Sequence, residues 1–71
     1  MRFLLENMDE KEFNKVMRIA IGNGVSLDDI THSVNANNRY SIDIYTPHQE
    51  IADDVEYELI ENYFIPLIIS H

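Results

Sequence analysis

The chain has 71 residues, of which 13 are acidic, 5 are basic and none is cysteine, and its formal net charge is −8. This length allows one small domain over residues 1–71, and a hydrophobic share of 45% is enough to build a core. The excess of acid argues against direct binding to DNA, RNA or anionic membranes, which requires a basic surface.

Several features of the sequence favour a cytoplasmic protein. The absence of cysteine fits a reducing compartment. The apolar start is too short for a signal peptide and meets Glu6 at once, and the apolar C-terminal run is too short to cross a bilayer. A domain of this size with neither disulfides nor a metal cluster has a thin stability margin, so we expect a homodimer.

The first predicted element is a strand over Met1–Glu6. Alternation along this run places Phe3 and Leu5 on one face and Leu4 on the other. Asn7, which follows the strand, resembles a helix N-cap because a glutamate comes three residues later.

The second predicted element is a helix over Asp9–Ile21. Its apolar stripe comprises Phe13, Val16, Met17, Ala20 and Ile21. Acidic residues fill the first turn, and Lys15 and Arg18 come later, as the helix dipole favours. We expect Gly22-Asn23-Gly24 to end the helix, because glycine and asparagine adopt the left-handed conformation of a C-cap readily.

A β-hairpin is predicted next, with strands over Ile30–Val34 and Arg39–Tyr45 around the turn Asn35–Asn38. The second of these strands alternates, with Tyr40, Ile42 and Ile44 on one face and Ser41, Asp43 and Tyr45 on the other. An alternative for residues 26–34 is a short helix that Ser26 would cap and Asp29 would complete as an S-x-x-D box. The sequence leaves open whether this segment is strand or helix.

The most unusual stretch runs over Thr46–Tyr63 and predicts a second helix. Thr46 suits the N-cap, Pro47 the first helical position, and Gln49 the partner position of a capping box. On a helical wheel the inner side carries Ile51, Ala52, Val55, Leu59 and Tyr63. The outer side carries Glu50, Asp53, Asp54, Glu58 and Glu61, with Tyr57 among them and Glu56 at the flank. The segment contains no lysine or arginine.

Within Phe64–Ser70, Pro66 discourages a continued helix, and the β-branched run after it predicts a last strand, with Pro66 at its start or on an edge. The resulting order is strand, helix, strand, strand, helix, strand. With right-handed crossovers this order gives an α+β, ferredoxin-like βαββαβ sandwich: a four-stranded antiparallel sheet with two helices on one face. The first and third strands would be central and the second and fourth would be edges.

The face of the sheet that the helices leave open should carry Leu4, Ser41, Asp43, Tyr45 and alternate residues of Leu67–Ile69. Its apolar part is an aggregation hazard unless another surface covers it. We therefore expect the homodimer to form through the C-terminal strand or the open sheet face. A two-fold dimer would present the acidic helix twice.

The sequence offers no constellation typical of catalysis, so we expect a protein that is not an enzyme and binds no cofactor or metal. Ser33 and His32 are neighbours on opposite strand faces and cannot form a nucleophile–base pair. His48 has no second ligand at helical spacing, and His32 suits a packing role beside apolar neighbours.

The acidic outer side of the second helix allows two interpretations. The first is an ordinary solvated surface, since acidity favours solubility. The second is a binding surface for a basic partner. Glu50, Asp54, Glu58 and Glu61 recur every three or four residues over about 16 Å, so the row can stand in for nucleic-acid phosphates. Tyr57 adds a contact group of a type enriched in binding hot spots. Asp43 and Tyr45, on the exposed side of the third strand, could extend the patch if the dimer brings that surface round.

In length, acidity, lack of cysteine and rows such as DDVEYELIE, the chain resembles the small acidic proteins with which bacteriophages disable host machinery, including DNA mimics. Among these it is most similar to phage inhibitors of histone-like HU proteins. The resemblance implies a protein that covers the DNA-binding surface of a basic host protein, HU or another nucleic-acid-handling protein, in the bacterial cytoplasm. Two other functions stay open: an adaptor or inhibitor that docks through an edge strand, and a ferredoxin-like module that senses a small ligand.

Overall fold

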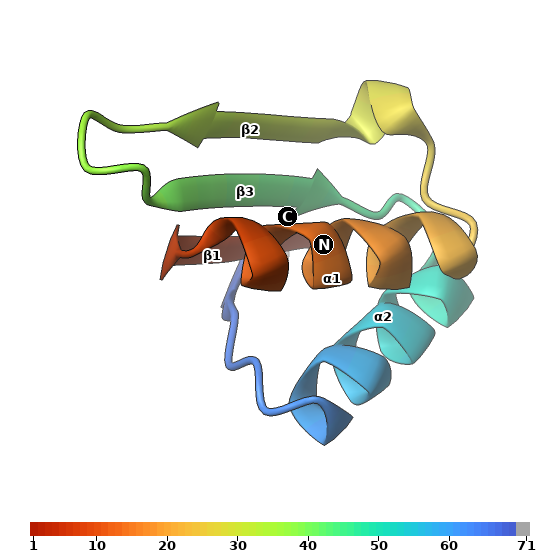
Figure 1. Ribbon diagram of the computed structural model, residues 1–71. Coiled ribbons are helices and arrows are strands. Elements are labelled where there is room, and N and C mark those ends of the chain that lie inside the picture. The colour runs from red at the N-terminus through yellow and green to blue at the C-terminus, as the bar shows by residue number, and fades with distance from the viewer. Residues whose placement is uncertain (70–71) are drawn as a thin grey trace.

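The computed structural model describes residues 1–69 (Figure 1). In chain order its elements are β1 (Arg2–Met8), α1 (Glu10–Gly22), the 3₁₀ helix η1 (Leu27–Asp29), β2 (Ile30–Val34), β3 (Tyr40–Tyr45), α2 (Gln49–Glu61) and β4 (Leu67–Ile69). The strands form one antiparallel sheet in the order β2-β3-β1-β4. The predicted ferredoxin-like sandwich, with the first and third strands central, is confirmed.

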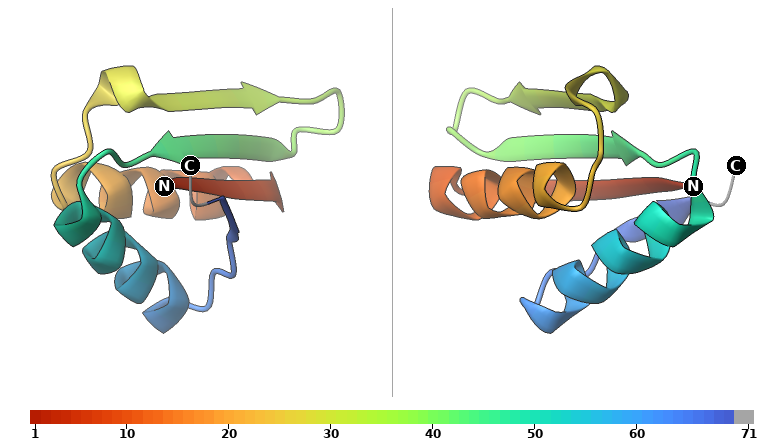
Figure 2. Two further views of the ribbon diagram at one scale, coloured as in Figure 1. Left: turned by 180° about the vertical axis from the view of Figure 1, so that it is seen from behind. Right: turned by 90° about the vertical axis from the view of Figure 1, so that its right-hand side faces the viewer.

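The core lies between the helices and one face of the sheet (Figure 2). In the central strand pair, Phe3 lies opposite Ile44 and Leu5 opposite Ile42, and all four side chains are buried. The alternation predicted for both strands is therefore confirmed. The first strand is longer than expected, because its pairing with β3 resumes after an irregularity and reaches Met8, which is also buried.

The N-cap of α1 is Asp9, so the prediction that Asn7 caps this helix is wrong. The Asp9 side chain accepts a hydrogen bond from the backbone N–H of Glu12, and the Glu12 carboxylate accepts one from the backbone N–H of Asp9. This reciprocal pair satisfies two N–H groups that the first turn leaves free. Asn7 remains within β1, in a left-handed conformation with φ of 59° at the irregularity of the strand.

The buried stripe of α1 is rotated from the predicted one. Val16 and Ala20 are buried as expected, but Ile19 is buried where Ile21 was predicted, and Ile21 is exposed. The two helices pack against each other, and Ile19 lines the groove between them beside Asn62. A helical wheel that assumes contact with the sheet alone does not predict this contact of α1 with α2. The helix ends at Gly22 as predicted.

Both interpretations of residues 26–34 hold in part. Ser26 caps a short helix, but this is the single 3₁₀ turn η1, and its hydroxyl accepts from the N–H of Asp28 at 3.2 Å rather than from Asp29. Strand β2 begins directly afterwards at Ile30 and pairs with β3. The predicted asparagine turn closes this hairpin, since the Asn35 side-chain oxygen accepts from two backbone N–H groups, those of Asn37 and Arg39.

Helix α2 begins later than predicted. Thr46 is not its cap: its hydroxyl and its backbone N–H both donate to the carbonyl of Met1, at 2.9 and 2.8 Å. These bonds hold Thr46 against the start of β1, where it is buried, so it cannot serve α2. The N-cap position falls on His48, which makes no side-chain capping bond.

The other end of α2 also differs from the prediction. The helix ends at Glu61, and Tyr63 adopts a left-handed conformation with φ of 67° and is 93% exposed. Tyr63 therefore does not belong to the buried stripe. Strand β4 follows the buried Pro66, as predicted, and Ser70 lies outside the described residues. In the described part of the chain, neither helix has the length and apolar character needed to span a bilayer.

Candidate functional site

Three fully buried side chains fix the orientation of α2. Ala52, Val55 and Leu59 have no exposed surface, and they follow one another at helical spacing along the inner side. Because these three positions are held in the core, the opposite side of the helix must face solvent. The predicted inner stripe is thus confirmed for these residues.

The outer side of α2 carries the carboxylates that the sequence placed there. Every residue of this set is exposed: Glu50, Asp53, Asp54, Tyr57, Glu58 and Glu61. We call these six residues the acidic face. Glu56, which was predicted at the flank, is half-buried. At 1.5 Å of rise per residue, the acidic face extends over about 16 Å from the first carboxylate to the last.

No lysine or arginine neutralises the acidic face within residues 1–69, where the one ion pair joins Arg2 to Asp43. Two carboxylates of the face accept hydrogen bonds from neutral amides. Glu58 accepts from Asn23 of the α1 C-cap at 2.9 Å, and Asp53 accepts from Gln49 at 2.8 Å. An amide donor orients a carboxylate but brings no positive charge to it.

The acidic face is unfavourable for the helix that carries it. Like charges three or four residues apart cost a few tenths of a kcal/mol per pair. Glu58 and Glu61 also lie near the C-terminal end of α2, where the helix dipole favours cations, and the last turn contains no basic residue. The helix dipole favours Glu50 in the first turn, but local helix stability does not explain why Asp54, Glu58 and Glu61 are acidic.

Asp43 does not extend the acidic face. It lies on the open side of the sheet, opposite the helices, because its neighbours Ile42 and Ile44 point into the core. Both Arg2 guanidinium nitrogens Nε and Nη2 donate to its carboxylate, the first at 3.3 Å. Hydrogen bonding to Asp43 and the charge of its carboxylate raise the pKa of Arg2 above its ordinary value. Asp43 is thus both remote from α2 and neutralised.

The basic residues of α1 border the acidic face without pairing with it. Lys11, Lys15 and Arg18 line a groove of about 460 Å³ between the helices, together with Glu58. The helix layer consequently has a basic edge on α1 and an acidic face on α2. None of these three cations approaches a carboxylate within ion-pair distance among the described residues.

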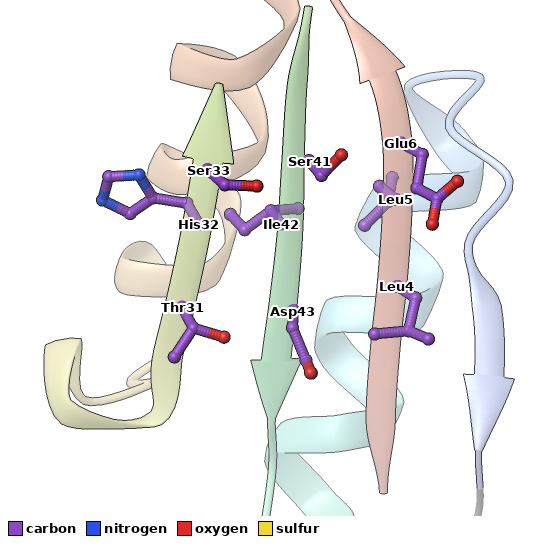
Figure 3. Close-up of a pocket in the computed structure, with 9 residues that line it drawn as sticks. All are labelled: Leu4, Leu5, Glu6, Thr31, His32, Ser33, Ser41, Ile42 and Asp43. Atoms are coloured by element: carbon purple, nitrogen blue, oxygen red, sulfur yellow. The ribbon is translucent and has the colours of Figure 1, made fainter. Parts of the chain in front are cut away.

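The open side of the sheet has a shallow hollow of about 350 Å³ (Figure 3). Its floor carries small polar and acidic side chains from three strands: Thr31, Ser33, Ser41, Asp43 and Glu6, with Leu4 at the β1 side. His32 points away from this hollow and packs on the helix side of β2, where its ring lies 5.2 Å from that of Phe13. Ser33 and His32 therefore lie on opposite faces as predicted, although His32 is more exposed than expected.

The structure also shows an exposed apolar group that the sequence reasoning placed only in part. Tyr63, Ile65, Leu67 and Ile68 lie around the connection between α2 and β4, and the first two are about nine-tenths exposed. Pro66 is the signal of this in the sequence: a proline ends the helical period, so Tyr63 lies outside the helical wheel of α2.

Comparison of the chain with protein-family models, curated proteins and solved structures gave no match.

Proposed function

We propose that the acidic face of α2 binds the basic, nucleic-acid-binding surface of another protein and thereby excludes nucleic acid from it. The best single target is a histone-like HU protein, as the resemblance to phage inhibitors implies. The observation that carries the proposal is the row of exposed, unpaired carboxylates on one side of a helix whose other side is fully buried.

The spacing of the charges suits this role. Along the helix axis, Glu50, Asp54, Glu58 and Glu61 follow one another at about 4.5 to 6 Å, and they come from a packed helix. Phosphates of one DNA strand recur about every 3.4 Å along the axis, so the row offers a comparable although sparser line of charge. A basic surface that evolved to bind such a line attracts the acidic face at long range.

The composition of the two helices supports a binding surface over an ordinary solvated one. A solvated helix gains from mixed signs, as α1 has with its two first-turn glutamates, two lysines and one arginine. Helix α2 has six carboxylates and no lysine or arginine in the same length of 13 residues. Selection for solubility alone requires acidity somewhere on the chain, and does not require that one helix carry six acids without a base.

The experiment that tests the proposal is displacement of a fluorescent DNA duplex from purified HU. The wild-type chain should release the duplex, since both compete for one basic surface. The double variant Asp54→Asn with Glu61→Gln should need about tenfold more protein for the same release, because two of the five charges of the face are lost.

A matched control removes two exposed carboxylates elsewhere. Glu6→Gln with Asp28→Asn removes the same amount of negative charge but leaves α2 intact. If this control loses as much activity as the α2 variant, net charge rather than the acidic face is responsible. If the wild type releases no duplex from HU or from any other basic nucleic-acid-binding protein tested, the proposal fails.

A further inference from the structure

Another hollow, of about 380 Å³, lies between β1 and the connection from α2 to β4. Side chains of β1, of the first turn of α1 and of this connection line it, among them Glu6, Met8, Glu12, Tyr63, Ile65 and Leu67. We call it the edge hollow. Ligand sites in proteins measure about 300 to 1,000 Å³, so the edge hollow has room for a few residues of an extended chain and not for a folded domain.

The edge hollow occupies the place that a longer β4 would take in the sheet. Strand β4 pairs with β1 over Arg2–Leu4, whereas β1 continues to Met8. The chain before β4 bends away from β1 beside Glu6 (Figure 3). Within residues 1–69, no strand covers this side of β1 over Leu5–Met8. About 13 Å of strand edge is therefore left without a partner for its backbone groups.

The connection from α2 to β4 gives the edge hollow an apolar wall. Tyr63 is 93% exposed, Ile65 90% and Leu67 64%, so the chain by itself leaves most of this wall in contact with water. Leu5 and Met8, which line the hollow from β1, are buried. An occupant with apolar side chains would cover the wall and remove its apolar surface from water, which favours binding.

Two carboxylates give the edge hollow a negative charge. Glu6 and Glu12 are both exposed, and Figure 3 shows the Glu6 side chain on the β4 side of β1. The capping box of α1 uses Oε1 of Glu12 and leaves Oε2. In the described part of the chain, no lysine or arginine lies within ion-pair distance of either carboxylate. Arg39, whose Nε donates to the Asn7 side-chain oxygen at 3.0 Å, pairs with neither. The charge therefore favours a cationic occupant.

The free strand edge, the apolar wall and the carboxylates together indicate what fits. A small amine would use the carboxylates but not the strand edge. A second copy of this chain would bring a net charge of −8 to a negative hollow. We propose that the edge hollow binds a short extended segment of another protein that combines lysine or arginine with apolar residues.

The segment adds to the sheet in line with β4. Its backbone pairs with the edge of β1 over Leu5–Met8, as in other cases of strand addition. Side chains of an extended chain point alternately to the two faces of the sheet. Glu6 lies on the open face and Glu12 belongs to the helix layer, so a basic side chain on either face meets a carboxylate. Apolar side chains of the segment cover Tyr63 and Ile65.

The test is an NMR titration of the isotope-labelled chain with an acetylated and amidated peptide of the sequence Val-Lys-Val-Lys-Val-Lys, in about 0.15 M salt. The peptide should bind saturably, with a Kd below about 1 mM. The amide shifts should be largest over Leu5–Met8 and Tyr63–Leu67, because these segments form the two walls of the hollow.

Two altered peptides separate the contributions of charge and backbone. Glutamate in place of every lysine should abolish binding, because like charges then meet in the hollow. Methylation of every backbone nitrogen keeps the lysine charges but removes the N–H donors, so the Kd should rise at least about tenfold.

The first turn of α1 provides a matched pair of variants. Glu12→Gln removes a charge from the edge hollow and preserves the capping box, which accepts glutamine at this position. It should raise the Kd about fivefold. Glu10→Gln removes the same charge from the same turn outside the hollow and should leave the Kd unchanged. Ile65→Ser should also raise the Kd about fivefold without changing thermal unfolding, since Ile65 is almost fully exposed.

Several results would overturn the inference. They are no saturable binding by the wild type, largest shifts on α2, equal effects of the two glutamate variants, or equal binding of the methylated peptide. The inference does not rest on the proposed function, because no residue of the acidic face lines the edge hollow. The Asp54→Asn, Glu61→Gln variant should bind the peptide as the wild type does, so the two proposals can fail separately.

Discussion

The two helices of this protein have the same length and pack on the same face of one sheet, yet they differ in capping and in the signs of their charged residues. Helix α1 has a reciprocal capping box at its start and charges of both signs. Helix α2 has no side-chain cap and charges of one sign only. The contrast indicates that α1 is stabilised locally as well as by the core, whereas α2 depends mainly on the core.

The largest effect is expected from breaking the core contact of α2. Leu59→Ala removes a side chain with no exposed surface, and we expect it to cost about 2 to 5 kcal/mol in the free energy of unfolding. Ile60→Ala, at the exposed neighbouring position, should change it by no more than about 0.5 kcal/mol. Urea denaturation measures both. Similar losses in the two variants would show that the inner stripe does not hold α2.

The next largest difference between the two helices is expected when their N-cap residues are replaced. Asp9→Ala breaks the capping box of α1 and should cost about 0.5 to 2 kcal/mol. His48→Ala at the equivalent position of α2 removes no capping bond, so its effect should be close to zero. Thermal unfolding of the two variants side by side tests this. A larger loss at His48 would contradict the comparison.

The smallest effect concerns the helix dipole. Glu61→Lys places a cation in the last turn of α2, and we expect a gain of a few tenths of a kcal/mol. In α1, Arg18 lies just before the last turn, so Arg18→Glu should lose no more than this amount. Urea denaturation at low salt measures both changes in the free energy of unfolding, and each change should shrink as salt is added. If Glu61→Lys destabilises the chain, the acidic face contributes to the fold and our account of it is wrong.

The fold could be predicted from sequence patterns that lie within single helices and strands. Alternation in Phe3 to Leu5 and in Tyr40 to Tyr45 predicted the central strands correctly, because each strand has one face on the core. Helix ends were harder to predict. Thr46 looked like a cap by type and spacing, but its hydroxyl bonds to the carbonyl of Met1, a contact between residues 45 positions apart that no local pattern contains.

The same limit applies to the candidate site. The outward side of α2 could be predicted, since its inner apolar residues determine what remains outside. Asp43 was placed correctly on the open face of the sheet, and only a dimer that brought this surface round could join it to the acidic face. The neutralising role of Arg2 also depends on strand register, which pairs β1 with β3.

The most direct test of the central claim is the salt dependence of binding between this chain and a purified HU protein. We predict that the logarithm of the dissociation constant rises steeply with the logarithm of salt concentration for the wild type. The Asp54→Asn, Glu61→Gln variant should give a clearly shallower slope, because fewer charges are neutralised on binding. Equal slopes for the two proteins, or no binding at low salt, would contradict the assignment of the acidic face as the binding surface.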